Sequence, residues 1–140
     1  SERQRMVNPR KAYPIDMGLI STYSRIGQTK EGHALETAVM LELERRGAQI
    51  TYVRTRQRFE VDFHARYPGG RTELIQVCAN LDAADTRERE MRALMDAREE
   101  HPHATAHLIG LVPEMPRDLW PGIRWHAASR WLLEQTEPDD

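Results

Sequence analysis

The residues best suited to chemistry lie in one stretch, residues 59–79, which reads FEVDFHARYPGGRTELIQVCA. Each half alternates apolar and polar side chains, the pattern of a half-buried strand. The middle, Pro68-Gly69-Gly70, is typical of a tight turn, because glycine adopts the positive φ that such a turn needs. The stretch therefore predicts a hairpin that brings Asp62 opposite Gln76. A carboxylate at mid-strand costs stability unless it is paired or binds a cation, so Asp62 is the first candidate for a functional role.

The alternation also predicts which side chains share a face of each strand. In the first strand the apolar residues are expected together on one face (Phe59, Val61 and Phe63), and the polar ones on the other (Glu60, Asp62 and His64). In the second strand one face should carry Ile75 and Val77, and the other Leu74, Gln76 and Cys78. Glu60 then lies opposite Cys78, and an acid-bearing patch forms within an otherwise apolar sheet.

A basic loop precedes the hairpin and carries Arg54, Arg56 and Arg58. The net charge of the chain is −2, so bulk electrostatics do not indicate nucleic-acid binding, which would need a local basic patch. These three arginines are the candidate contacts to phosphate groups. The alternative is an ordinary solvated loop.

Helices and strands around the hairpin must hold these residues in place. Thr29 is a plausible N-cap for a helix from about Lys30 to Arg46 that ends at Gly47, and Glu36 lies at the edge of its apolar stripe. The other expected elements are a helix over Met17–Tyr23, a strand over Ile50–Arg54, a helix from an Asp85/Glu88 capping box to Glu100, a buried strand over Thr105–Val112, a strand over Ile123–His126 and a helix over Ala127–Gln135. A first strand over Lys11–Ile15 is also possible. The order predicts an α/β fold, a mixed central sheet flanked by helices on both faces.

Length and composition bound the class of protein. The 140 residues, 39% hydrophobic and 30% charged, are typical of one soluble domain. We expect an N-terminal arm over residues 1–7, a single domain over 8–135 and a disordered acidic tail over 136–140. There is no apolar run that could span a membrane and no signal-peptide pattern. The single cysteine cannot form an intrachain disulfide, so a cytoplasmic location is expected. No phosphate-binding loop of the G-x-x-x-x-G-K-[ST] type occurs.

The helical Glu36, the strand Asp62 and the following Gln76-Val77-Cys78 come in an order that resembles the PD-(D/E)xK nuclease superfamily. More closely, the segments KAYPIDMGL, EGHALETAVMLELERRG, EVDF, LIQVC and TREREMRAL resemble the nuclease-like C-terminal domain of prokaryotic AAA-type ATPases. The likeness covers roughly residues 8–135. It implies a restriction-endonuclease-like αβββαβ core and an attached or partner ATPase.

The resemblance also implies roles for single residues. Glu36 matches the helical acid, Asp62 the strand acid and Gln76 the acidic position of Glu-x-Lys, while Cys78 stands where the superfamily has its lysine. Asp62, Gln76 and the backbone carbonyl of Val77 would be the ligands of a divalent cation, with Mg²⁺ as the candidate cofactor.

This sequence departs from the superfamily at two of those positions. A phosphodiester-cleaving site needs a hard cation held by oxygens and positive charge near the reacting phosphate. Gln76 supplies only a neutral carbonyl, and the thiol of Cys78 is neutral near pH 7 unless its pKa is lowered. All but two of the 20 basic residues, Lys11 and Lys30, are arginine. Lys30 lies six residues before Glu36 but well round the helix from it, and Lys11 is far off in sequence, so no lysine is expected at the site. We therefore expect a degenerate centre that binds Mg²⁺ weakly or not at all.

Three functions remain open at this stage. The first is a DNA-binding or interaction module of a larger ATPase with impaired or no nuclease activity. The second is an active metal-dependent endonuclease that uses Asp62, Gln76 and Glu36 with a relocated basic residue. The third is a protein-interaction domain that regulates the attached ATPase. The oligomeric state is not predicted.

Structural roles for the same residues are also open. Asp62 and Glu36 could form ion pairs with neighbouring arginines, and Gln76 and Cys78 could pack in the core. The histidines at 101, 103 and 107 match no common zinc spacing. Trp120, Trp125 and Trp131 are expected to pack the C-terminal region rather than to stack on bases.

Overall fold

A five-stranded mixed sheet forms the centre of the computed structural model, which describes residues 29–134. The strands follow one another across the sheet in chain order. The first three form an antiparallel meander, and the last two are added in parallel. Their bounds are β1 Gln49–Arg54, β2 Glu60–Arg66, β3 Thr72–Cys78, β4 Thr105–Gly110 and β5 Ile123–Ala127. The predicted α/β class, a mixed sheet with helices on both faces, is confirmed.

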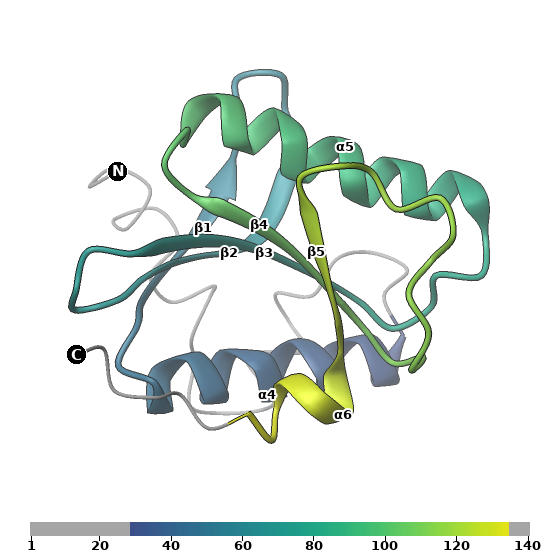
Figure 1. The fold of residues 1–140 in the computed structure, drawn as a ribbon, viewed down its shortest axis with the longest axis horizontal. Helices are drawn as coiled ribbons and strands as arrows, with labels where there is room; N and C mark the ends of the chain where they lie inside the picture. Colours follow the sequence, from purple (N-terminus) through teal and green to yellow (C-terminus); the bar gives the residue numbers. More distant parts are fainter. Residues whose placement is uncertain (1–28, 135–140) are drawn as a thin grey trace.

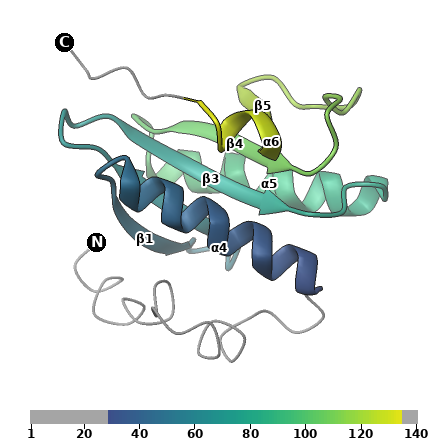
Figure 2. The same cartoon turned by 90° about the horizontal axis from the view of Figure 1, so that it is seen from below.

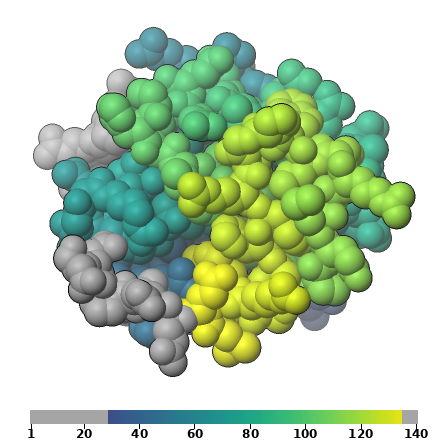
Figure 3. Space-filling view, viewed as in Figure 1, coloured from purple at the N-terminus to yellow at the C-terminus, as the bar shows by residue number. Residues whose placement is uncertain are grey.

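Helices cover both faces of this sheet. Helix α5 (Ala84–Glu100) lies on one face and connects the parallel strands β3 and β4, while α4 (Lys30–Arg45) and the short α6 (Ala128–Trp131) lie on the other (Figures 1 and 2). In the space-filling view the loop before β5 and the chain beyond it, in yellow-green and yellow, lie over the centre and right of the visible face (Figure 3). None of the helices between residues 29 and 134 has the length and apolar character that a membrane crossing requires.

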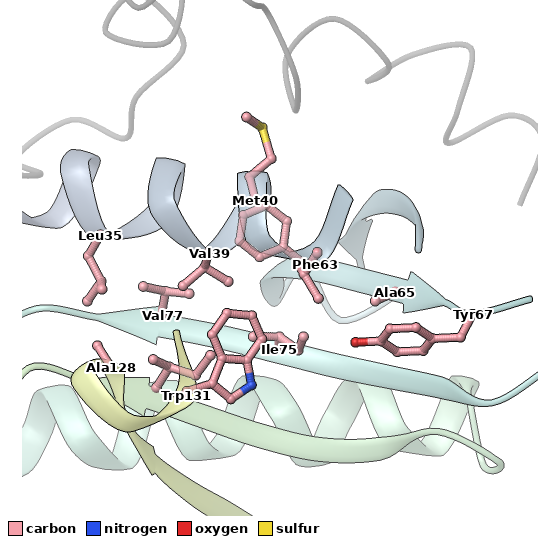
Figure 4. Packing of buried hydrophobic residues seen from close by; sticks show 12 residues of the cluster. Leu35, Val39, Met40, Phe63, Ala65, Tyr67, Ile75, Val77, Ala128 and Trp131 are labelled. Atoms are coloured by element: carbon pink, nitrogen blue, oxygen red, sulfur yellow. The ribbon is translucent and has the colours of Figure 1, made fainter. Parts of the chain in front are cut away.

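Helix α4 begins and ends with the residues that the sequence predicts. The Thr29 side chain accepts a hydrogen bond from the N–H of Gly32 at 3.1 Å, which satisfies one of the donors left open in the first turn. Gly47 follows the helix with φ +81°, a conformation that glycine adopts without strain. Figure 4 shows Leu35 and Val39 pointing from α4 towards Val77 of the sheet. These contacts belong to the larger core beneath α4 and α6.

Helix α5 starts differently from the prediction. Its N-cap is Ala83, which makes no side-chain capping bond, so the Asp85/Glu88 capping box is wrong. Asp85 instead lies in the first helical turn, where a carboxylate interacts favourably with the helix dipole. The buried face carries Met91, Ala93, Leu94 and Ala97. Together with residues of β2, β3 and β4 these side chains form the second core.

Several predicted bounds are also corrected. The strand expected over Thr105–Val112 ends at Gly110, and the C-terminal helix is only four residues long. The possible strand over Lys11–Ile15 and the helix over Met17–Tyr23 lie outside the described residues.

A β-bulge in β2 overturns the predicted faces of that strand. Thr51 pairs with His64, but Val53 pairs with Val61, so two steps along β1 match three along β2. A bulge adds one residue, bends the strand and shifts the alternation of side chains. As a result Val61 packs in the core under α5, whereas Phe63 packs in the core under α4. The expectation that Phe59, Val61 and Phe63 share one face is therefore wrong.

A row of polar side chains runs from strand to strand at the end of the sheet where β2 finishes and β3 begins. The hydroxyl of Tyr67 donates to the Glu73 carboxylate, and Nε2 of His107 lies 3.0 Å from the other oxygen of Glu73. Nδ1 of His107 lies 2.8 Å from Nε2 of His126 on β5. Burial acts to raise the pKa of Glu73, but the hydrogen bonds from His107 and Tyr67 lower it to about 2. This chain of contacts ties the meander to both parallel strands.

The histidines of the sheet predict how stability depends on pH. Burial, reinforced by a neighbouring histidine, lowers the pKa of His64 and of His126 from 6.5 to about 4. Between these values the unfolded chain binds protons that the folded protein does not, so the free energy of unfolding should fall as pH drops from 6.5 towards 4. His64→Gln and His126→Gln should each reduce this slope, as measured by urea unfolding from pH 7 to pH 4. His103→Gln, on an exposed residue, is the control, and equal slopes in all variants would contradict the assignment.

Candidate metal centre

The predicted pair, Asp62 and Gln76, meets where β2 and β3 stop pairing through their backbones. The ladder between the two strands runs from Arg66↔Thr72 to Phe63↔Ile75, while β2 remains paired with β1 as far as Glu60. The bulge lies at the same place, and it turns β2 away from β3. The two side chains therefore occupy the part of the sheet where a backbone ladder would otherwise continue.

Three hydrogen bonds replace the missing ladder. Oε1 of Gln76 accepts the backbone N–H of Asp62 at 2.9 Å, and Nε2 of Gln76 donates to the carbonyl of Glu60 at 3.2 Å. Oδ2 of Asp62 accepts the backbone N–H of Val77 at 2.8 Å. A carboxamide can serve both strands because it carries a donor and an acceptor, as a peptide group does. Asp62 is 5% exposed and Gln76 1%, so these bonds satisfy backbone groups where water has little access.

Cys78 lies on the same face as Gln76, as the alternation predicts, and packs against the core under α5. Its Sγ donates to the carbonyl of Asn80 at 3.2 Å. Burial, together with the negative charges of Glu90 and Asp62, raises the pKa of the thiol to about 11. The thiol is therefore neutral near pH 7 and supplies neither a positive charge nor a reactive thiolate.

The sequence reasoning missed Glu90. This residue lies on α5, is 5% exposed, and is close enough to Cys78 for its charge to raise the thiol pKa. The neighbouring Arg89 lies 3.7 Å from the Glu90 carboxylate. A charged residue inside the apolar repeat of α5 is the signal that could have found it, since Glu90 lies three and four residues before the buried Ala93 and Leu94.

Glu36, the predicted helical acid, comes from the other side of the sheet. It lies on α4 and is half-buried, whereas strand alternation directs Gln76 and Cys78 to the face that α5 covers. The buried acid on the face of Gln76 and Cys78 is therefore Glu90 rather than Glu36.

The donor set fits a hard divalent cation poorly. Mg²⁺ and Ca²⁺ are held by several oxygen ligands, carboxylates among them. Of the predicted ligands only Asp62 has a carboxylate, and one of its oxygens accepts the Val77 N–H, while the Gln76 oxygen accepts the Asp62 N–H. Within residues 29–134 no three His, Cys, Asp or Glu side chains form a group that could hold a metal ion.

The three basic candidates lie on the hairpin between β1 and β2, whose tip reaches the level of α5 in Figure 1. Arg54, Arg56 and Arg58 are all exposed. Thr55 closes the loop by accepting from Arg58 through its carbonyl and from Phe59 through its hydroxyl. The N–H of Arg56 donates to the Glu100 carboxylate at the end of α5. The loop is therefore fixed to α5, and its arginine side chains point away from the core.

The remaining candidates of the sequence have structural contacts. Trp131 is buried under α4, and its ring is covered by Arg46 at 4.2 Å. Trp120 and Trp125 pack at the edge of the core under α5, so packing of the C-terminal region by the tryptophans is confirmed. The ring of His101 lies 4.7 Å from that of His64, and His107 joins the polar network described above.

Comparison with protein-family models, with curated proteins and with solved structures finds no match.

Replacing the carboxamide by a carboxylate tests its role in the sheet. Gln76→Glu removes the donor to the Glu60 carbonyl and adds a charge beside Asp62, so it should lower the free energy of unfolding by about 1–3 kcal/mol at pH 7. The loss should shrink as pH falls, because the protonated acid regains a donor. Urea unfolding from pH 7 to pH 4 measures both effects.

Gln49→Glu on the exposed start of β1 is the matched control. A Gln76→Glu variant as stable as this control would show that the bridging hydrogen bonds add nothing to the free energy of unfolding. Unfolding in 10 mM Mg²⁺ should give the same result as in its absence.

Proposed function

We propose that this chain is a nucleic-acid-binding module with a nuclease-like architecture that does not cleave phosphodiester bonds. The proposal rests on the hydrogen bonds by which Asp62 and Gln76 bridge β2 and β3. In these bonds, side-chain oxygens that a metal ion would need as ligands accept backbone N–H groups instead. The nuclease kinship and the attached ATPase follow from the resemblance of the sequence alone.

The charge at Cys78 supports the absence of cleavage. Phosphoryl transfer needs positive charge beside the reacting phosphate, and the raised pKa of Cys78 leaves a neutral thiol where the superfamily has lysine. Binding does not need that centre. Exposed arginines on an anchored loop can contact phosphates at low entropic cost, because the loop is already ordered by Thr55 and Glu100.

Salt-dependent binding to a labelled 20-bp duplex tests the proposal. Each phosphate contact adds about 0.9 to the slope of log K against log salt. Replacing Arg54 and Arg56 by Gln should therefore lower the slope by about 2 if both contact phosphates. Arg66→Gln, an exposed arginine at the other end of β2, should leave it unchanged. No binding even at 50 mM salt would overturn the proposal in favour of a protein-interaction domain.

Cleavage is measured separately on supercoiled plasmid with Mg²⁺ or Mn²⁺. The wild-type protein should nick no faster than Asp62→Ala, and unfolding curves should establish that the variant is folded. Metal-dependent nicking that Asp62→Ala abolishes would refute the non-cleaving half of the proposal.

The position of Glu90 favours one second candidate, a nuclease whose missing charges come from α5. Glu90 would replace the acid lost at Gln76, and Arg89 the lysine lost at Cys78. This candidate requires that Glu90→Gln abolish plasmid nicking while Glu88→Gln, on an exposed carboxylate of the same helix, does not.

A further inference from the structure

Two pairs of histidines are in ring contact, and they differ in what their ring nitrogens bind. The rings of His107 and His126 are stacked with centres 5.0 Å apart, and Nδ1 of His107 lies 2.8 Å from Nε2 of His126. The ring centres of His64 and His101 are 4.7 Å apart. Within residues 29–134 the ring nitrogens of this second pair form no hydrogen bond with each other or with a third residue. The second pair therefore has nitrogens that are available to a ligand.

His64 and His101 are held on the same side of the sheet by two different elements. The neighbours of His64 on β2, Phe63 and Ala65, belong to the core under α4, so strand alternation directs the His64 ring towards α5. His101 is the C-cap of α5, and its backbone N–H donates to the carbonyl of Ala97. The two rings thus meet through backbone positions that the strand and the helix already fix.

Both rings are neutral near pH 7. Burial is the main cause that lowers the pKa of His64 to about 4, and burial also lowers the pKa of His101. A neutral imidazole has a nitrogen lone pair that can bind a metal ion, whereas a protonated ring must first lose a proton. Both residues are only half-buried, so an ion in solution can reach them.

The distance between the rings suits a single shared ion. With a Zn–N bond of about 2 Å, two imidazoles on one tetrahedral ion have ring centres about 5 Å apart, close to the 4.7 Å between His64 and His101. Imidazole nitrogen is a ligand for Zn²⁺, Cu²⁺ and Ni²⁺, whereas Mg²⁺ and Ca²⁺ take oxygen ligands. The pair therefore selects a different class of ion from the one expected at Asp62 and Gln76.

The charges around the pair permit a cation. His101 ends α5, and the carbonyl groups at the C-terminus of a helix carry partial negative charge. Burial lowers the pKa of His101, and the nearby negative charge of Glu100 acts against this lowering. The positive charge of Arg66 opposes a cation, but it contributes least to the lowered pKa of His64, after burial and His101.

We propose that His64 and His101 together bind one Zn²⁺ or a similar late transition-metal ion. Two protein ligands leave the other positions of a tetrahedral ion to water or to an external ligand, unlike a structural zinc site with four protein ligands. The short sequence spacing of His101, His103 and His107 points to a different set of ligands. The structure separates that set, because His107 bonds to Glu73 in the network under α4. The site is independent of the proposed binding of nucleic acid.

Calorimetric titration of the metal-free full chain with Zn²⁺ at pH 7.5 tests the proposal. The wild type should bind one ion. His64→Gln and His101→Gln should each weaken binding at least about tenfold, which corresponds to 1.4 kcal/mol. The double variant should lose little more, because either single change already removes the shared site. His126→Gln, from the pair whose facing nitrogens bind each other, is the matched control and should bind as the wild type does.

Urea unfolding gives a second measurement. Zn²⁺ should raise the midpoint of the wild type and of His126→Gln, because an ion that binds only the folded chain stabilises it. It should leave the midpoints of His64→Gln and His101→Gln unchanged, and Mg²⁺ should raise none of them. The curves without metal establish that each variant is folded.

Three results would overturn the proposal. Two ions per chain, of which each single variant removes one, would show that the histidines act separately. A loss in His126→Gln as large as that in His64→Gln would place the ion elsewhere. Equal affinity of the wild type and the double variant would reduce the pair to a packing contact. None of these results bears on binding of the duplex.

Discussion

The fold depends on how one buried gap in the sheet is closed. The bulge at Asp62 and Phe63 separates β2 from β3, and an open gap would leave peptide groups of both strands without partners in an apolar interior. Gln76 and Asp62 fill it with side-chain groups that imitate the missing ladder. The bend that makes the gap also lets Val61 pack beneath α5 while Phe63 packs beneath α4. A single bulge therefore places nearby residues of β2 in both cores. The hydrogen bonds of Gln76 and Asp62 offset its cost, which is the loss of partners for peptide groups.

Much of the architecture follows from local sequence signals. Thr29 and Gly47 mark the ends of α4, and the Pro68–Gly70 turn sets a register in which Phe63 pairs with Ile75. These features depend on residues near one another in the chain, whose conformational preferences are strong. The bulge could not be predicted, because the alternation of residues 59–64 is equally compatible with a regular strand. Val61 and Phe63 point to opposite faces of the sheet because each packs against a different helix, and the local sequence does not specify this packing.

The candidate site could be predicted only in part, because local signals place some of its residues and the packing of helices places the others. Pairing of adjacent strands brings Asp62 to Gln76, and this needs only the turn. It is harder to predict which helix contributes an acid, because the choice between Glu36 on α4 and Glu90 on α5 depends on which helix covers which face of the sheet. The start of α5 was also misjudged, since Asp85 and Glu88 fit a capping box by type, whereas the N-cap is Ala83, two residues before Asp85. The polar network of Tyr67, Glu73, His107 and His126 joins four separate segments and has no local signature.

The double hydrogen bond of the Gln76 carboxamide limits which amino acids position 76 can accommodate. Only two of the twenty standard side chains end in a group that both gives and receives through an amide, and asparagine is one methylene too short to reach both strands from the same backbone. The hydrogen bonds to both strands thus restrict position 76 on structural grounds alone. Intolerance to substitution there would follow from architecture and would not by itself be a sign of catalysis.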